Sequence, residues 1–269
     1  MHPLDGPRLK VGRAVDHLNA LRRLENAFFA DEQYEVVRSE FNSQTGKYIY
    51  RVRANVVPGP DWGVYIGDIA HNLCSALDGL VYQLALLNPK VKAPAPNIQF
   101  PVFLRGRTSR TRLNRKGRPI QVKQFEGMEL GNGRSMIRDL LPEHQAVIER
   151  LQPYKRGRGG KANPLYLLRK INFADKHRLV QVVGIRPFMY SWSNAADDAD
   201  IRHLPYRVLE DGTKLVEAAP HVRVYPHVVP EIAFWKGCAP ARNLPVTDTL
   251  HDISDHVSEI VEGFGPEFD

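Results

Sequence analysis

The stretch WGVYIGDIAHNLCSALDGLVYQLALL, residues 62–87, decides the fold that we predict for this chain. At about 100° per residue its apolar side chains fall on one side, which predicts a long amphipathic helix. Those apolar positions are Ile66, Ile69, Leu73, Leu77, Leu80 and Leu84. The polar positions on the opposite side are Asp68, His71, Asn72, Ser75, Asp78 and Tyr82. We expect this central helix to end before the breaker Asn88-Pro89.

The polar side of this helix lacks the residues that usually face water. Between Trp62 and Leu87 there is no Lys, Arg or Glu, and Gln83 is the one Gln. Those residue types propagate a helix well, whereas Asp, Asn and Ser compete with its backbone for hydrogen bonds. Amphipathic geometry alone would give an ordinary solvated face. The composition instead favours a hydrogen-bonded surface that is buried or lines a cleft.

Outward from the central helix, the chain has the pattern of an α+β protein. Helical spacing predicts further helices over 13–29, 134–140, 142–151, 164–177 and 247–262. Alternation predicts a hairpin of 34–42 and 47–57, joined by the turn SQTG. Further strands are predicted over 179–191, 204–210, 213–218, 222–229 and 231–235.

These elements predict three parts in one integrated domain, residues 1–269. A helical core of about 13–178 is built on the central helix 62–87 and carries the N-terminal hairpin. A β-rich part of about 179–238 forms a C-terminal antiparallel sheet, which the terminal helix of about 247–262 closes. We expect one unit because the first and last helices both need a partner surface.

Composition predicts a globular protein without a membrane partner. Hydrophobic residues make up 43% of the chain and charged residues 25%, as is usual for a soluble domain. No apolar run reaches the roughly 18–20 residues of a membrane span, and the first residues lack the apolar centre of a secretory signal. The two cysteines, Cys74 and Cys238, make no zinc-site spacing. We therefore expect a cytoplasmic protein; its oligomeric state is left open.

The net charge of +7 is concentrated in the stretch RGRTSRTRLNRKGRPIQVK, residues 105–123. No acid interrupts its basic residues, which are Arg105, Arg107, Arg110, Arg112, Arg115, Lys116, Arg118 and Lys123. Such a cluster attracts nucleic acid through counterion release, and Arg110, Arg112, Arg115 and Lys116 are the binding residues that we predict. The alternative is a solvated loop, because the stretch has no aromatic residue that could stack on a base.

Polar residues also fall on the apolar sides of two other predicted helices. Asn172 and Asp175 share a side with leucines on 164–177, and Glu25 does so on 13–29. A lone buried carboxylate is unfavourable unless it is paired, hydrogen-bonded or bound to metal. We therefore expect these acids to meet those of the central helix. A purely structural ion-pair network, such as Asp175 with Arg178, is the alternative.

Two motifs resemble a widespread bacterial family that has no established activity. The first, Gly-Asp-x-x-His-Asn-Leu-x-Ser-Ala-Leu-Asp, occurs here as GDIAHNLCSALD, residues 67–78. The second, Asp-Lys-His-Arg, occurs at 175–178, and FPVF at 100–103 and IERLQPY at 148–154 also fit. The resemblance covers roughly residues 13–183. It implies no mechanism.

The family pattern has Arg where this chain has Cys74 and His where it has Gly79. An Arg followed five positions later by His resembles the motif of HEPN-type ribonucleases, which cleave RNA without metal. Since this chain has neither residue, a ribonuclease here would need His71 or His177 as the general base. Arg178 or Lys176 would then stabilise the phosphorane.

Three functions from different classes remain open at this point. The first is an RNA-binding or RNA-cleaving HEPN-like protein without a cofactor. Its catalytic candidates are Asp68, His71, Asp78, Asp175, His177 and Arg178, and its further binding candidates are Asn72, Asn172 and Lys176. The second is a divalent-metal site of a hydrolase or oxidoreductase, in which Asp68 and His71 share one helix face. Glu25 and Asp175 would complete it, with Asp78 as a further acid. The third is a non-catalytic structural or interaction protein.

Overall fold

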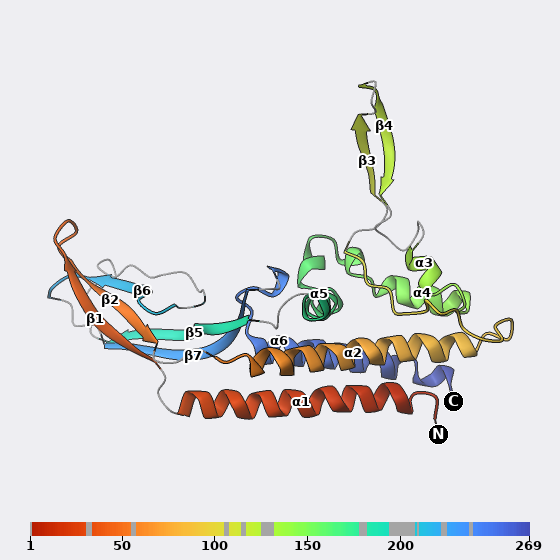
Figure 1. Cartoon of the computed structure of the whole chain (residues 1–269), viewed down its shortest axis with the longest axis horizontal. Coiled ribbons are helices and arrows are strands. Elements are labelled where there is room, and N and C mark those ends of the chain that lie inside the picture. Colours follow the sequence, from red (N-terminus) through yellow and green to blue (C-terminus); the bar gives the residue numbers. More distant parts are fainter. Residues whose placement is uncertain are drawn as a thin grey trace. The chain divides into compact units, whose positions relative to one another are not determined.

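The computed structural model describes residues 2–30, 34–54, 58–104, 108–113, 117–124, 132–177, 182–193, 208, 210–221, 225–236 and 239–269. Its α-helices are α1 (Asp5–Ala30), α2 (Asp61–Leu86), α3 (Asn132–Met136), α4 (Pro142–Arg150), α5 (Pro164–His177) and α6 (Val246–Gly263) (Figure 1). Its strands are β1 (Tyr34–Asn42), β2 (Lys47–Ala54), β3 (Thr108–Leu113), β4 (Pro119–Gln124), β5 (Val182–Ser193), β6 (Lys214–Ala218) and β7 (Tyr225–Lys236). The predicted mixture of helix and sheet is confirmed. No described helix is both long and apolar enough to cross a membrane.

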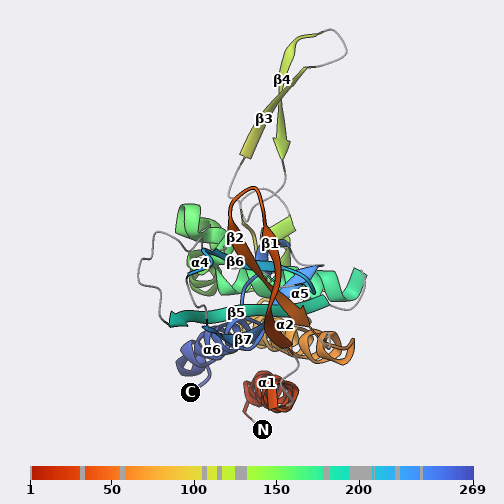
Figure 2. The ribbon, with the colours of Figure 1, turned by 90° about the vertical axis from the view of Figure 1, so that its left-hand side faces the viewer.

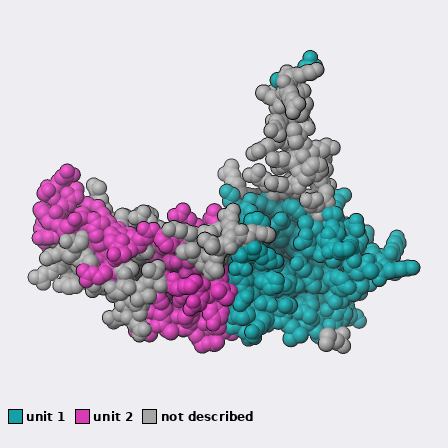
Figure 3. Space-filling model, in the orientation of Figure 1, with its two compact units in different colours: residues 1–17, 67–177, 250–269 teal, residues 18–66, 178–249 magenta. Residues whose placement is uncertain are grey.

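The chain forms two compact units, which Figure 3 colours separately. The first unit comprises residues 1–17, 67–177 and 250–269, and the second comprises 18–66 and 178–249. That the whole chain acts as one integrated domain stays a prediction.

The core of the first unit is built on α2. Its apolar side is buried as predicted: Ile69, Leu73, Leu80 and Leu84 are all 0% exposed. The parts of α1, α2 and α6 that belong to this unit lie alongside one another in both ribbon views (Figures 1 and 2). α1 approaches α2 at Gly79, where a Cβ would lie in ordinary van der Waals contact with Pro7, at 3.5 Å.

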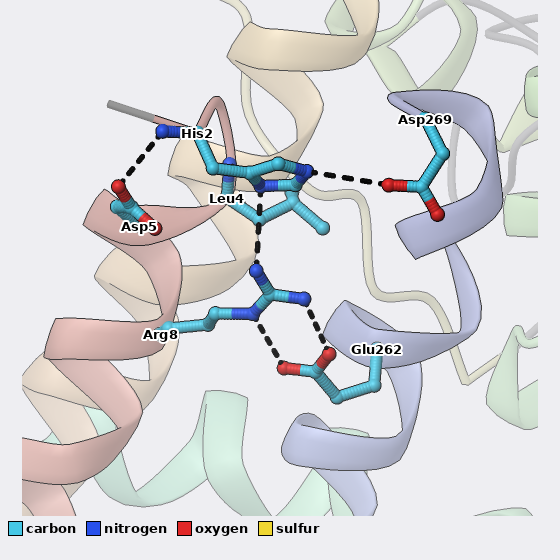
Figure 4. Close-up of polar contacts among 6 residues, drawn as sticks. All are labelled: His2, Leu4, Asp5, Arg8, Glu262 and Asp269. Atoms are coloured by element: carbon cyan, nitrogen blue, oxygen red, sulfur yellow. Dashed lines mark hydrogen bonds and ion pairs between the residues drawn. The ribbon is translucent and has the colours of Figure 1, made fainter.

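A polar clasp joins the first turns of α1 to the end of α6 (Figure 4). Two nitrogens of the Arg8 guanidinium, Nε and Nη2, donate to the Glu262 carboxylate at 2.9 and 2.7 Å. The ring Nδ1 of His2 accepts from the Leu4 amide at 3.1 Å and lies 3.3 Å from Arg8 Nη1. The His2 amide donates to Asp5 at 2.8 Å. We call this set of residues, with Asp269, the terminal clasp.

The predicted N-terminal hairpin is confirmed as β1–β2, whereas the pairing of the later strands differs from the prediction. β2 lies between β1 and β6, β5 pairs with β7, and β3 pairs with β4, all antiparallel. β6 was expected in a C-terminal sheet but instead extends the N-terminal hairpin. β7 is one continuous strand where two were expected. The closure of a C-terminal sheet by α6 stays a prediction.

Two connections between the predicted elements carry regular structure. The basic stretch contains the hairpin β3–β4, in which Arg110 pairs with Val122 and Arg112 with Ile120. Gly117, at φ +69, lies between the two strands in a conformation that favours glycine. Pro153–Ala162 forms a 3₁₀-helix. A loop interpretation of the basic stretch was wrong for 108–113 and 119–124, which pair as strands.

Candidate binding cavity between α2 and α5

A cavity of about 190 Å³ lies in the first unit between α2 and α5. Its polar lining residues are Cys74, Asp78, Gln99, Arg169, Asn172 and Lys176. Apolar side chains complete the wall, among them Phe100, Val102 and Phe173. The cavity therefore joins the two motifs that are far apart in the sequence, GDIAHNLCSALD and the end of α5.

The close approach of α5 to α2 depends on Gly67. A Cβ at this position would lie 2.6 Å from Asp175 Cγ, closer than real Cβ contacts allow. The Asp175 carboxylate therefore rests against the α2 backbone where Gly67 has no side chain. This gives a steric reason for Gly67 in the first motif: a larger residue there would require the Asp175 side chain to move or the two helices to separate.

The segment 99–103 forms a second wall and is held by side chains on both sides. Asp78 Oδ1 accepts a hydrogen bond from the Phe100 amide at 2.9 Å. Gln152, which is 0% exposed, donates to the Pro101 carbonyl at 2.7 Å and accepts from the Phe103 amide at 3.0 Å. The Gln99 amide also donates to the Met136 carbonyl at 3.3 Å. These hydrogen bonds satisfy backbone groups of residues 99–103, which belong to no described strand.

Asn172 and Cys74 form the inner polar part of the cavity. The Asn172 side chain slightly lowers the pKa of the Cys74 thiol. Asn172 Oδ1 is buried and has no hydrogen-bond partner among the described residues. Burial raises the pKa of the Cys74 thiol to about 12, and the charge of Asp78 adds to this effect. At neutral pH Cys74 is thus a protonated thiol and a poor nucleophile.

Cationic side chains lie at the outer part of the cavity. Lys176 and Arg169 are both exposed. Arg169 is anchored, since its Nη1 donates to the Val102 carbonyl and its guanidinium lies 5.4 Å from the centre of the Phe103 ring. Burial raises the pKa of Asp78, against the Phe100 hydrogen bond and the charges of Lys176 and His71. The cavity thus has acceptors inside and cations outside.

The polar side of α2 divides into two parts. Asp78 is partly buried and lines the cavity, as expected, and Cys74, which was not among the expected polar positions, lines it too. Asp68 and His71 are exposed, so the expectation of a buried or cleft-lining surface was wrong for them. Asn72 donates back to the Asp68 carbonyl at 2.8 Å, within the helix. Asp175 and Gly67 are close, but Asp68, His71 and Asp175 are not among the residues that line the cavity.

Glu25 belongs to the second unit, where its carboxylate has a structural role. It accepts from the Ile232 amide at 3.1 Å and from the Thr247 hydroxyl at 2.5 Å, so it joins α1 to β7 and to the first turn of α6. Among the described residues, no contact between Glu25 and the acidic residues of α2 is seen. In the part of the chain that the structure describes, no group of three or more His, Cys, Asp or Glu side chains could hold a metal ion.

Several predicted residues lie outside the part of the chain that the structure describes. They are Arg178, Arg115 and Lys116, and of His177, Arg110 and Arg112 only the backbone is described. Conversely, sequence reasoning missed Gln99, Phe100 and Arg169 as lining residues. The sequence offered one signal for the wall formed by residues 99–103. This signal was FPVF at 100–103, which fits the pattern of the bacterial family that the chain resembles.

Comparison of the chain with family models, with curated proteins and with solved structures finds no match. The resemblance to a bacterial family and to HEPN-type ribonucleases therefore stays a prediction.

Proposed function

We propose that this protein binds single-stranded RNA, with one base in the α2–α5 cavity and the neighbouring phosphates along the basic hairpin β3–β4. The observation that supports this proposal is the position of the cavity's lining residues in the sequence. The residues that line it lie on both sides of the basic stretch, at Val102 before it and at Met136 after it.

Chain length keeps the hairpin near the cavity. Thr108, where β3 begins, follows the lining residue Val102 by six residues. Six extended residues span at most about 20 Å, so the root of the basic hairpin cannot lie farther from the cavity than a few nucleotides reach. A nucleic acid held by the hairpin is thereby brought to the cavity.

The size of the cavity fits one aromatic ring system better than a large ligand. An engineered cavity of about 150 Å³ in another protein holds benzene, and this one measures about 190 Å³. Phe173 lines it and is 51% exposed, which offers a face for stacking. A base can enter only when it is unpaired, and unpaired bases are what proteins read in RNA loops and single strands.

Binding without cleavage is the form of this function that the described residues favour. The positions at which the HEPN resemblance would need Arg and His are Cys74 and Gly79. Cys74 carries a protonated thiol, and His71 is exposed on α2 and is not among the lining residues. We therefore propose that the protein binds RNA without cleaving it.

The test is fluorescence anisotropy with labelled single-stranded RNA of about twelve nucleotides. We expect binding that weakens as salt rises from about 50 to about 200 mM, because phosphate contacts release counterions. The variant R110Q/R112Q should lose affinity, and its slope of log K against log salt should fall by about 0.7 per phosphate contact removed. The control K10Q/R23Q removes two exposed charges of α1 and should change neither value.

No binding of RNA by the unchanged protein at the lower salt concentration would refute the proposal. So would equal losses in R110Q/R112Q and K10Q/R23Q, since the effect would then reflect net charge alone. A single-stranded DNA of the same sequence tests the choice of RNA: tighter binding of the DNA would contradict that choice.

A further inference from the structure

We infer that the outer face of α5 is a stacking track for unpaired bases, along which the RNA strand continues beyond the α2–α5 cavity. This inference rests on the proposed function for the class of ligand, because it names a second surface that the same strand contacts. It comes from the side chains of α5 rather than from the basic hairpin, whose two strands contain no aromatic residue.

Aromatic and cationic side chains are interleaved on this face of α5. At about 100° per residue, five positions of the helix fall within an arc of about 120°. In chain order they are Tyr166, Arg169, Lys170, Phe173 and Lys176. None of the five is buried, and Phe173 is 51% exposed. The face thus offers two rings, each with a cation within one turn of the helix.

The acid of this helix does not interrupt the outer face. Asp175 falls on the opposite side of α5, where it lies against Gly67 of α2. Residues 150–174 contain no Asp or Glu, and the 3₁₀-helix before α5 adds the exposed cations Arg156 and Lys161. The outer face of α5 therefore carries positive charge that no acid of the same face offsets, as binding of phosphates requires.

The track is continuous with the cavity at one end. Arg169, Phe173 and Lys176 also line the cavity, whereas Tyr166 and Lys170 do not. Lys170 Nζ lies 5.5 Å from the centre of the Tyr166 ring, so this ring and its cation form a pair. Tyr166 precedes Phe173 by seven residues, which is about 10 Å along the helix. A strand with one base at Phe173 thus meets a second ring within reach of its next bases, and stacking of this kind tolerates any sequence.

The experiment separates stacking from charge with two variants at positions outside the cavity. Fluorescence anisotropy with the full chain and the twelve-nucleotide single strand is measured over a range of salt concentrations. Y166L should weaken binding about fivefold or more, as the loss of one base–aromatic stack does, without changing the slope of log K against log salt. K170Q should lower that slope by about 0.7, because it removes one phosphate contact.

The controls Y82L and K10Q make the same two changes at exposed positions of α2 and α1. Neither should change the affinity or the salt slope. Y166F keeps the ring and should bind RNA as the unchanged protein does, since stacking uses the face of the ring.

The outcomes distinguish this inference from the proposed function. RNA binding that Y166L leaves unchanged overturns the stacking track and leaves the proposed function intact, whereas absence of binding by the unchanged protein overturns the proposed function itself. A loss in Y82L as large as that in Y166L also overturns the inference. Should Y166L fail to fold by circular dichroism, K170Q decides alone: a salt slope equal to that of the unchanged protein overturns the track.

Discussion

The terminal clasp and the α2–α5 cavity are both polar clusters of the first unit, and they differ in how completely their hydrogen bonds are used. In the clasp, Arg8 meets both oxygens of Glu262 and the His2 ring accepts from the Leu4 amide (Figure 4). In the cavity, Asn172 Oδ1 is buried without a described partner. The comparison separates a cluster that joins helices from one that retains capacity for a ligand.

This difference bears on the question that the sequence left open, whether the polar side of α2 is a network or a site. A network is recognised by reciprocal partners, and Glu25 in the second unit is a further example, with two donors on its carboxylate. A binding site retains unused acceptors and sacrifices some stability for function. By this criterion the Asp78 end of α2 belongs to a candidate site.

The largest expected effect comes from adding a methyl group at Gly67, where the Asp175 side chain of α5 lies against α2. G67A should lower the free energy of unfolding by about 1–3 kcal/mol, because its methyl group overlaps the Asp175 carboxylate. G12A is the matched control, since a Cβ there meets nothing within 4 Å, and it should stabilise the helix by about 0.5–1 kcal/mol. Urea denaturation measures both. If D175A does not reduce the penalty of G67A, the steric explanation is incorrect.

A second effect distinguishes the two clusters by the sign of their pH dependence. Burial raises the pKa of Asp78, so its contribution to stability is fully present below the unfolded-state pKa and is lost as pH rises through the folded-state value. D78N should therefore gain stability relative to the unchanged protein between acidic and neutral pH. The Arg8 hydrogen bond lowers the pKa of Glu262, whose contribution is present above the unfolded-state value and is lost as pH falls. Denaturation of D78N and E262Q across pH should show opposite slopes.

A third effect concerns the unsatisfied acceptor itself. N172L replaces a buried oxygen that has no described partner with an apolar group of similar size, which should leave stability unchanged or raise it by up to about 1 kcal/mol. Thermal denaturation in the absence of RNA measures this change. A clear loss of stability would show that Asn172 belongs to a structural network like the clasp.

The smallest effect is expected for the clasp. R8M removes the hydrogen bonds to Glu262, yet both side chains are substantially exposed, at 39% and 51%, and water screens such pairs. We expect a slight loss of stability at low salt that disappears at high salt. A large loss that persists in high salt would mean that the clasp carries more of the fold than its exposure suggests.

The helices were predictable because their apolar sides follow helical spacing, as Leu73 and Leu80 on α2 and Leu250 and Val257 on α6 show. The pairing of β6 with β2 was not, because alternation identifies a strand without identifying its neighbour. The candidate site was predictable only in part. Asp78 and Asn172 were recognised as unusual for their helices, whereas the wall at Gln99–Phe100 depends on long-range hydrogen bonds that its amides donate to Asp78 and Met136, which leave no local pattern.

The central claim, that an RNA base enters the α2–α5 cavity, is tested most directly by ultraviolet cross-linking of bound single-stranded RNA followed by mass spectrometry of the protein. The account predicts cross-linked peptides that contain Phe100 or Phe173, the aromatic residues that line the cavity. Cross-links confined to peptides of the second unit, or to the hairpin β3–β4 without either phenylalanine, would contradict it.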